Sequence, residues 1–426
     1  MRTRILCFLL VLLLLAGCAG APEETELPKE ETKAPMEARL ESLRALGSAP
    51  DDGICTWYEI FVGAFRDSDG DGTGDLQGVI SSLDYLQDLG IGGLWLMPVH
   101  PSDSYHKYDV KDYCAVDPAY GTMEDLEELL EETQKRGMKV ILDLVMNHTS
   151  VRHPWFREAA AYLASLDPEK EPDSRLCPPV EYYRFQRQEA LGFGPVPGAE
   201  GWYYECRFSP DMPDVNFESQ ALREKFREIM AFWLDKGVDG FRLDAAKEFY
   251  SGETDRNLEV LGWIQTTARE INPDCFLVGE VWDGFSALSE YYDSGFVSFF
   301  NFPFAAPDGK IVKVLRGAGN PGIVTTWATA QEKADAAYRS HNPDYIDAPF
   351  LSNHDLGRIA GFAGRDPGKT KLAAAMNLFM SGNAFVYYGE ELGMVAGALD
   401  DPSYRAPMVW GGEGTPNPPP GCTLPD

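Results

Sequence analysis

The stretch Gly240-Phe241-Arg242-Leu243-Asp244-Ala245-Ala246-Lys247 decides the fold of this chain. Its first half belongs to a segment, residues 238–243, that alternates apolar and polar residues and predicts a short buried strand. Because side chains alternate between the two faces of a strand, we expect Arg242 and Asp244 to point to the same side. A guanidinium beside a carboxylate favours the ionised form that a carboxylate nucleophile requires. Taken alone, the stretch also fits a structural Arg-Asp pair in a core.

Three other strand-like segments also end in polar residues. They cover residues 141–148, 276–280 and 348–355, and they end in Asn147-His148, in Glu280 and in Asn353-His354-Asp355. The carboxyl ends of parallel barrel strands meet at one mouth, where barrel enzymes place their catalytic groups. Four strands that each deliver acids or histidines therefore predict a (β/α)8 TIM barrel with its site at that mouth.

Composition limits the class of protein. The 426 residues include 44% hydrophobic and 12% aromatic residues, which is ample for a large core. The formal net charge of -30 argues against binding of nucleic acid, because few cations are available to neutralise phosphates. The charge therefore fits an uncharged substrate and a soluble exterior. We also expect a monomer.

The N-terminal segment predicts export. Arg2 and Arg4 precede an apolar run at residues 5–15 that is short for a membrane span, and small residues follow it. The run Leu15-Ala16-Gly17-Cys18 resembles a lipoprotein signal, so we expect residues 1–17 to be removed and Cys18 to be lipidated. An ordinary secretory signal is the alternative. Residues 18–50 predict a flexible linker, which would leave the folded body outside the cytoplasmic membrane on a lipid anchor.

From residue 54 onward, strands and helices alternate, which implies a parallel sheet. Eight strands are predicted at residues 54–62, 93–99, 139–146, 238–243, 275–279, 296–302, 345–351 and 384–388. Helices are predicted at residues 76–89, 123–136, 219–237, 253–271 and 369–380. Residues 147–218 lack periodicity and are too many for a loop, so they predict a small domain inserted after the third strand. The barrel would then comprise residues 51–146 and 219–392, followed by an irregular segment at 393–426.

The three carboxylates at strand ends suit glycoside hydrolysis. That reaction needs a nucleophile, a proton donor of raised pKa, and negative charge near an oxocarbenium-like transition state. Retention through a covalent intermediate would require Asp244 and Glu280 to lie about 5 to 5.5 Å apart. A zinc or binuclear metal site is the rival chemistry, but the nearby histidines lack the spacing of metal ligands. The six cysteines beyond Cys18 suggest neither a metal cluster nor a particular disulfide pairing.

The chain resembles the α-amylase family of glycoside hydrolases (family 13). The motifs that carry the resemblance follow in order at residues 93–99, 143–148, 212–216, 240–247, 279–282 and 352–355. The resemblance implies that Asp244 is the nucleophile, Glu280 the general acid/base and Asp355 the stabiliser of the transition state. It also implies a set of substrate-binding residues, namely His106, Tyr108, His148, Arg242, Lys247 and His354. The family more often has glycine where Lys107 stands, and we expect this lysine to alter the edge of the subsite. The family's last barrel helix and C-terminal β-domain are not recognised after residue 388, as expected of a truncated chain or a fragment.

Residues 67–75 form an oxygen-rich loop of alternating acids and glycines that suits a hard cation. The resemblance places a structural Ca2+ here, bound through Asp67, Asp69, Asp71, Asp75 and the carbonyl of Thr73. An acidic solvated turn is the alternative. A second calcium site, using Asn147 and Asp214, occurs in parts of the family.

The motifs favour an α-amylase that cleaves internal α-1,4 bonds of an α-glucan or malto-oligosaccharide. A neopullulanase-like activity and an oligo-1,6- or α-glucosidase activity remain the alternatives, because residues 212–216 are intermediate between the groups. Glu248 stands where many amylases have histidine, which leaves the product pattern and transglycosylation open. A hypothesis of a different class is a non-catalytic glucan-binding protein on the same fold. The complete set of three carboxylates argues against it.

Overall fold

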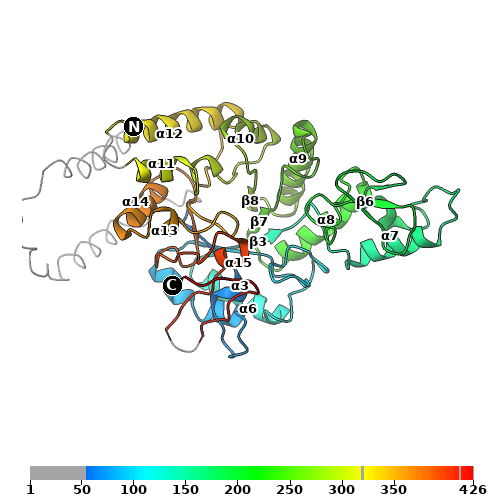
Figure 1. Ribbon diagram of the computed structural model, residues 1–426, viewed down its shortest axis with the longest axis horizontal. Helices are drawn as coiled ribbons and strands as arrows, with labels where there is room; N and C mark the ends of the chain where they lie inside the picture. Colours follow the sequence, from blue (N-terminus) through cyan, green and yellow to red (C-terminus); the bar gives the residue numbers. More distant parts are fainter. Residues whose placement is uncertain (1–53, 318–320, 412–413, 426) are drawn as a thin grey trace, which may run out of the picture. The chain divides into compact units, whose positions relative to one another are not determined.

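The structure, a computed structural model, describes residues 54–317, 321–411 and 414–425 (Figure 1). The expected signal segment, Cys18 and the linker lie outside this range. Within it, no helix combines the length and the apolar character needed to cross a membrane. Also within this range, the six cysteines are free thiols.

The centre of the fold is a parallel sheet. Its strands are β1 (Trp57–Ile60), β2 (Gly93–Leu96), β3 (Lys139–Leu144), β7 (Gly240–Leu243), β8 (Phe276–Gly279) and β9 (Phe385–Tyr387), hydrogen-bonded in the order β8-β7-β3-β2-β1-β9. In this register Asp143 on β3 lies opposite Arg242 on β7. The strands are shorter than predicted, and the expected end of the first one instead forms the short helix α3 (Val62–Phe65).

The sheet closes on itself between β8 and β9. Three parallel bridges fill this gap and join Gly279 to Phe299, Phe300 to Ala348, and Phe350 to Phe385. The amide of Asn301 donates to the carbonyl of Ala348 (3.0 Å), and that of Phe385 donates to the carbonyl of Pro349 (2.8 Å). These two linking segments lie where strands six and seven are predicted. The (β/α)8 barrel is therefore confirmed.

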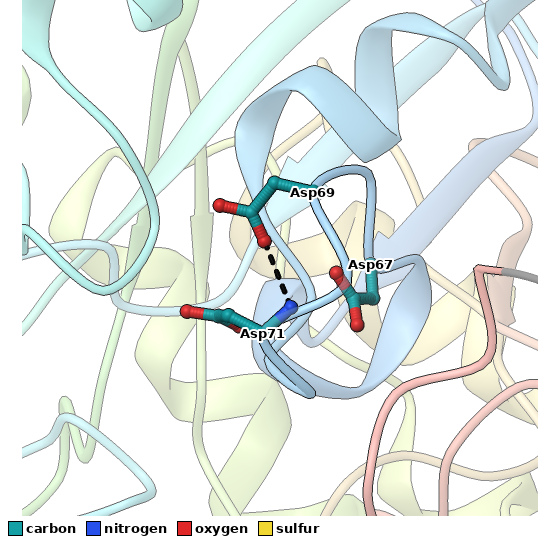
Figure 2. A group of neighbouring side chains, drawn as sticks. All are labelled: Asp67, Asp69 and Asp71. Atoms are coloured by element: carbon teal, nitrogen blue, oxygen red, sulfur yellow. Dashed lines mark hydrogen bonds between the residues drawn. The ribbon is translucent and has the colours of Figure 1, made fainter.

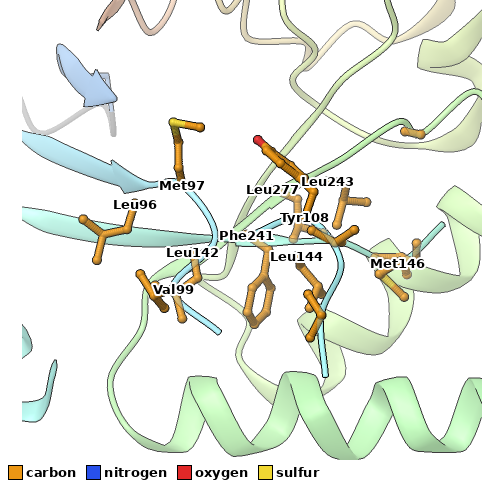
Figure 3. Packing of buried hydrophobic residues seen from close by; sticks show 14 of the residues in the cluster. Leu96, Met97, Val99, Tyr108, Leu142, Leu144, Met146, Phe241, Leu243 and Leu277 are labelled. Carbon is orange, nitrogen blue, oxygen red and sulfur yellow. The ribbon is translucent and has the colours of Figure 1, made fainter. Parts of the chain in front are cut away.

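The lumen and the outer face of the barrel have separate apolar cores. In β1, Trp57 belongs to the lumen cluster, while Tyr58 and Ile60 belong to the cluster under the helices. The lumen cluster includes Trp57, Trp95, Ile141, Val278, Phe300, Phe350 and Phe385. Each buried aromatic ring removes about 150–250 Å² from water, worth about 4–6 kcal/mol as an upper bound. On the outer face, Figure 3 shows side chains of β3, β7 and β8, among them Leu142, Phe241 and Leu277.

The helices begin at recognisable caps. In α6 (Met123–Lys135), Thr122 and Asp125 form the predicted capping box. Ser219 caps α8 (Gln220–Asp235), and α9 (Thr254–Ile271) also agrees with the prediction. The helix predicted at 76–89 is divided into α4 (Leu76–Ile80) and α5 (Leu83–Asp88). Asp366 caps α14 (Pro367–Leu378), which begins before the predicted residue because Pro367 is favoured in the first turn.

Several helices escaped the sequence prediction. They are α7 (Pro154–Ser165), α10 (Phe285–Tyr291), α11 (Lys310–Arg316), α12 (Pro321–His341) and α13 (Ile359–Phe362). The sequence of α12 explains its omission, because its apolar residues are mostly alanine and give no marked apolar stripe.

Between β3 and α8 the chain forms a small group of elements outside the barrel sheet. It contains α7, the 3-10 turn η2 (Pro178–Glu181) and an antiparallel sheet in the order β4-β6-β5, whose strands are Phe185–Gln186, Tyr203–Glu205 and Phe193–Pro195. A bridge between His148 and Asp214 and the bond from the amide of Val215 to the carbonyl of Asn147 (3.0 Å) connect this group to the end of β3.

The segment after β9 packs on the barrel. It contains the short helix α15 (Asp401–Tyr404). Beyond it, the amide of Met408 donates to the carbonyl of Ala64 (2.9 Å). The ring of Trp410 meets Phe65 edge-on at 5.2 Å. This return toward β1 carries α15 to the mouth of the barrel.

The close approach of β7 and β8 predicts a sharp effect of one methyl group. A Cβ at Gly240 would lie 1.8 Å from the carbonyl oxygen of Phe276. Because the obstacle is backbone, Gly240→Ala should lower the free energy of unfolding by about 1–3 kcal/mol or more. Gly361 in α13 has open space, and Gly361→Ala should raise that free energy by about 0.4–1 kcal/mol. Urea unfolding of both variants checks this, and an equal response would contradict the account.

Candidate active site

A cleft of about 1010 Å³ opens at the carboxyl ends of the barrel strands. Seven predicted site residues line it: His106, Tyr108, His148, Asp244, Lys247, Glu280 and Asp355. The other two, Arg242 and His354, are almost fully buried and contact the carboxylates of this group. Side chains from β7, from the ends of β3 and β8, and from the loop before Asp355 therefore converge at one place.

Arg242 is the hub of this cluster. Its Nη1 lies 2.6 Å from Asp244 Oδ1 and 3.0 Å from Asp143 Oδ2, and its Nη2 lies 3.0 Å from Glu280 Oε2. The contact between Arg242 and Asp244 is the one that the strand periodicity predicts. Because one planar guanidinium binds both Asp244 and Glu280, the two carboxylates face the same small volume of the cleft.

Glu280 has the environment of a proton donor. Burial raises its pKa, and the charges of Asp244 and Asp355 add to this effect against the opposing charge of Arg242. The amide of Ala245 donates to Glu280 Oε2 (2.9 Å). Ala245 holds this position with a φ of 46°, which is uncommon for a residue other than glycine. Such local strain is typical of functional sites.

Asp355 has the opposite environment. His354 Nε2 lies 3.1 Å from its Oδ2, and Arg405 Nη2 lies 3.1 Å from its Oδ1. Burial by itself raises the pKa of Asp355, but the charges of His354 and Arg405 outweigh burial and hold that pKa below its usual range. Asp355 is therefore ionised at neutral pH, while Glu280 retains a proton more readily. The surroundings therefore push the pKa values of these two carboxyl groups apart. One group can then act as an acid while the other supplies a fixed negative charge.

The remaining predicted residues offer neutral hydrogen-bonding groups. Burial lowers the pKa of both His106 and His148, so both imidazoles are neutral at pH 7. Within the described part of the chain, the buried Nε2 of His148 has no hydrogen-bond partner. A ligand hydroxyl in the cleft can supply that partner. Tyr108 donates to Asp143 (3.1 Å) and contacts His354 Nε2 (2.7 Å), which fixes its ring in the wall.

The two lysines near the cleft are both held by acids. Lys247 Nζ contacts the carbonyl of Trp282 and Asp283 Oδ2, each at 3.1 Å, and so joins the loops after β7 and β8. The interpretation of Lys107 was wrong. Its Nζ forms a buried ion pair with Asp117 at 2.7 Å, and Lys107 is not among the residues that line the cleft. Its φ of 67° lies in the left-handed region that favours glycine.

Sequence reasoning missed several residues of the cleft. Asp401 lies in α15 and Arg405 directly follows this helix, and the two side chains contact each other at 2.6 Å. Arg405 also contacts Asp355, so it joins this segment to that carboxylate. Trp282 is 51% exposed and stacks on Phe302, with ring centroids 5.3 Å apart. The motif around Glu280 contained Trp282 as a signal, whereas nothing in the irregular segment around Arg405 indicated a role.

The acidic loop brings three of its predicted ligands together. Figure 2 shows Asp67, Asp69 and Asp71, which each offer a carboxylate oxygen within 4.8 Å of the others. Their backbone is held by local bonds, among them the one from the amide of Asp71 to Asp69 Oδ1 (3.0 Å). The amide of Thr73 donates to Asp71 Oδ1 (2.7 Å). Asp75 instead caps α4, accepting from the amides of Gly78 (2.6 Å) and Ser68 (2.8 Å). Carboxylate oxygens are hard donors of the type that Ca2+ prefers.

Asn147 and Asp214, which bind a second calcium ion in parts of the family, are also neighbours. Asn147 Nδ2 donates to Asp214 Oδ1 at 3.2 Å, and the amide of Arg207 donates to Asp214 Oδ2 at 3.1 Å. Burial raises the pKa of Asp214 to about 7. Asn147 Oδ1 is buried and has no hydrogen-bond partner among the described residues, so the pair leaves one acceptor unsatisfied.

Comparisons with known proteins agree with this geometry. The family described as alpha amylase, catalytic domain, matches residues 59–414. Alpha-amylase 3 of Dictyoglomus thermophilum is 41% identical over 360 residues, which are 83% of this chain and 67% of that protein. A glucan 1,6-alpha-glucosidase of Streptococcus pneumoniae is 32% identical over 368 residues, 79% of this chain and 64% of that protein. The solved structure of Eubacterium rectale Amy13B gives a TM-score of 0.86 at 43% identity and covers 91% of this chain and 76% of that one.

The buried hub predicts a large and pH-dependent loss of stability. Arg242→Met leaves several buried carboxylates without a cation, so the free energy of unfolding should fall by about 3–5 kcal/mol at pH 7. Without the guanidinium, those carboxylates should have folded-state pKa values above their unfolded values. The loss in the free energy of unfolding, relative to the wild type, should therefore shrink as the pH falls toward 4. Arg339→Met, which removes an exposed ion pair with Asp335, should cost less than about 1 kcal/mol. Denaturant unfolding at pH 4 and pH 7 checks this, and equal losses for the two variants would refute the role of the hub.

Proposed function

The chain belongs to the alpha-amylase family of glycoside hydrolases, and we propose that it cleaves α-1,4-glucosidic bonds of starch-like α-glucans with retention of configuration. The observation that carries the proposal is the convergence of Asp244 and Glu280 on one buried guanidinium. Asp355, held ionised by a histidine and an arginine, lies at the same cleft. One nucleophile, one proton donor and one fixed negative charge are the groups that retaining hydrolysis needs.

In the first step, Asp244 attacks the anomeric carbon of the bound sugar. Glu280 donates its proton to the glycosidic oxygen, so that the C–O bond breaks and the leaving chain departs as an alcohol. The negative charge of Asp355 stabilises the oxocarbenium-like transition state. In the second step, Glu280 takes a proton from water, and the resulting attack on the anomeric carbon releases Asp244.

The cleft suits a neutral sugar polymer. The neutral imidazoles of His106 and His148 can exchange hydrogen bonds with hydroxyl groups, and the exposed face of Trp282 can stack on a pyranose ring. The carboxylates that line the same cleft would repel an anionic ligand. A polymer or oligomer of glucose fits both properties.

The similarity to an enzyme named glucan 1,6-alpha-glucosidase keeps a second linkage under consideration. Cleavage of α-1,6 bonds, or a neopullulanase-like action, would use the same three carboxylates with a different acceptor wall. The higher identity, 41% against 32%, lies with the relative named alpha-amylase, and this supports the α-1,4 preference. A binding protein without catalysis would not need a proton donor at Glu280.

A comparison of three substrates tests both the reaction and the linkage. We expect the protein to release malto-oligosaccharides from soluble starch faster than it cleaves pullulan or isomaltose, because the preference lies with α-1,4 bonds. Asp244→Asn should lower the rate on starch by at least about a thousandfold, since a neutral amide cannot act as the nucleophile.

The new reducing end should form first as the α anomer, as proton NMR of the early products can show. Equal rates for wild type and Asp244→Asn would refute hydrolysis at this site. A faster reaction with isomaltose than with starch would refute the preference for α-1,4 bonds but not glycoside hydrolysis at this site.

We also propose that the acidic loop binds a structural Ca2+ through Asp67, Asp69 and Asp71. The proposal is supported by the spacing of the three carboxylates and by the hard oxygen ligands that they offer. The loop is remote from the reacting groups in sequence, and the ion's task would be to neutralise three clustered charges. It would thereby stabilise the loop that leads into α4.

Calcium should therefore raise the stability of the wild-type protein. At a free ion concentration of a hundred times Kd, the free energy of unfolding should rise by about 2.7 kcal/mol. Asp69→Asn should weaken the response, whereas Glu131→Gln, an exposed carboxylate on α6, should leave it intact. Thermal unfolding with a chelator and with added Ca2+ measures the effect. An equal response in Asp69→Asn and wild type would contradict the site.

We further propose that the protein is exported and held at the outer face of the cytoplasmic membrane by a lipid on Cys18. Support comes from the charged, apolar and small-residue order of the N-terminal segment. Cys18→Ser should release the protein from the membrane fraction, while Cys7→Ser, in the segment to be removed, should not. Retention of both variants in the membrane fraction would contradict a lipid anchor at Cys18.

A further inference from the structure

Glu59 is a buried carboxylate to which the reaction described above assigns no task. It lies in β1, opposite Trp95 on β2 and Tyr387 on β9, and its side chain is 2% exposed. A carboxylate so far from water is costly unless a cation or several donors accompany it. Its Oε1 lies 2.6 Å from His354 Nδ1, so the imidazole is its partner.

His354 is held between two acids. Opposite Glu59, its Nε2 lies 3.1 Å from Asp355 Oδ2 and 2.7 Å from the hydroxyl of Tyr108. Ionised carboxylates can only accept hydrogen bonds, so two of them on opposite ring nitrogens require an N–H at each nitrogen. The ring stacks on Tyr108 at 5.5 Å and meets Trp95 edge-on at 5.8 Å, which restricts its rotation.

We propose that Glu59 is a positioning residue that keeps His354 doubly protonated and correctly oriented, so that the imidazolium holds Asp355 ionised and directed at the sugar. The inference rests on the proposed function, because the task of Asp355 belongs to it. Glu59 acts through His354 and does not itself line the cleft.

The charges around His354 favour this state. Burial of the ring lowers the pKa of His354, but Asp355 and Glu59 outweigh burial and raise that pKa from 6.5 to about 10. Tyr108, from the loop after β2, and Asp143, from β3, also face the ring. Arg242 on β7 and Arg405 after α15 act on its partner Asp355. Because the pKa of His354 is raised in the folded state, protonation of His354 stabilises the folded protein. This contribution to the free energy of unfolding is present in full below pH 6.5 and is lost as the pH rises through about 10.

Glu59→Gln removes the negative charge of the side chain and keeps its size and shape. The amide oxygen can still accept from His354 Nδ1. The control is Glu205→Gln, which removes another buried carboxylate. Glu205 lies on β6 and is paired with Arg184 and Arg207. Glu205 does not line the cleft. Any general effect of losing a buried acid should therefore be common to both variants.

The first measurement is the protonation of His354 by NMR of protein labelled with 15N in its six histidines. The signal is assigned with His354→Gln. In the wild type, both ring nitrogens should carry protons at pH 8, and the titration midpoint should fall by about 1–3 pH units in Glu59→Gln. The midpoint should not move in Glu205→Gln. A neutral ring in the wild type at pH 8, or equal midpoints in all three proteins, would overturn the proposal. If Glu59→Gln does not fold, the wild-type signal alone decides.

The second measurement is the pH dependence of kcat/KM for α-maltosyl fluoride. Fluoride leaves without a proton from Glu280, so the alkaline limb of the profile reports groups other than the general acid. This limb should move to lower pH by about 1–3 pH units in Glu59→Gln and stay in place in Glu205→Gln. An active wild type whose limb is unchanged in Glu59→Gln would overturn the role of Glu59. If the wild type cleaves no glycoside, the proposed function fails, while the NMR titration still decides the protonation of His354.

Discussion

The structure depends on one buried cation. Arg242 is 1% exposed, and it contacts acids from β3, from its own strand and from the end of β8. A buried guanidinium is tolerated only when its charge and its N–H groups are matched, and the same is true of each carboxylate around it. The register that places Asp143 opposite Arg242 therefore serves folding and function together. Loss of either partner leaves an unpaired charge in the core.

The barrel lumen is divided into an apolar layer and a charged layer. Rings such as Trp57 and Phe385 fill the layer below, and Glu59, Asp143 and Arg242 lie toward the mouth. Because the lower layer excludes water, the charges above it interact strongly and separate the pKa values of neighbouring acids. This is how Glu280 can hold a proton beside an ionised Asp355.

The strand ends were the most informative part of the sequence. They predicted the barrel and placed Asp244, Glu280 and Asp355 near one another, because parallel strands deliver their carboxyl ends to one side. Lys107 and Arg405 were not interpretable in this way. The side chain of Lys107 pairs with Asp117, a partner that only the fold identifies. Arg405 lies in a segment without periodicity whose path is set by tertiary contacts. Glu59 was visible as a lone acid in an apolar strand, but only the fold shows that His354 faces it.

In the proposed reaction, a carboxylate oxygen of Asp244 forms a covalent bond to the sugar. Trapping this glycosyl-enzyme intermediate is the most direct test of that role. A slow substrate such as a 5-fluoro-α-maltosyl fluoride should lose fluoride and form a glycosyl-enzyme that survives digestion and mass spectrometry. We expect one added 5-fluoromaltosyl group on the peptide that contains Asp244, and none in Asp244→Asn. An adduct on any other carboxylate, or turnover with inversion and no adduct, would contradict this role.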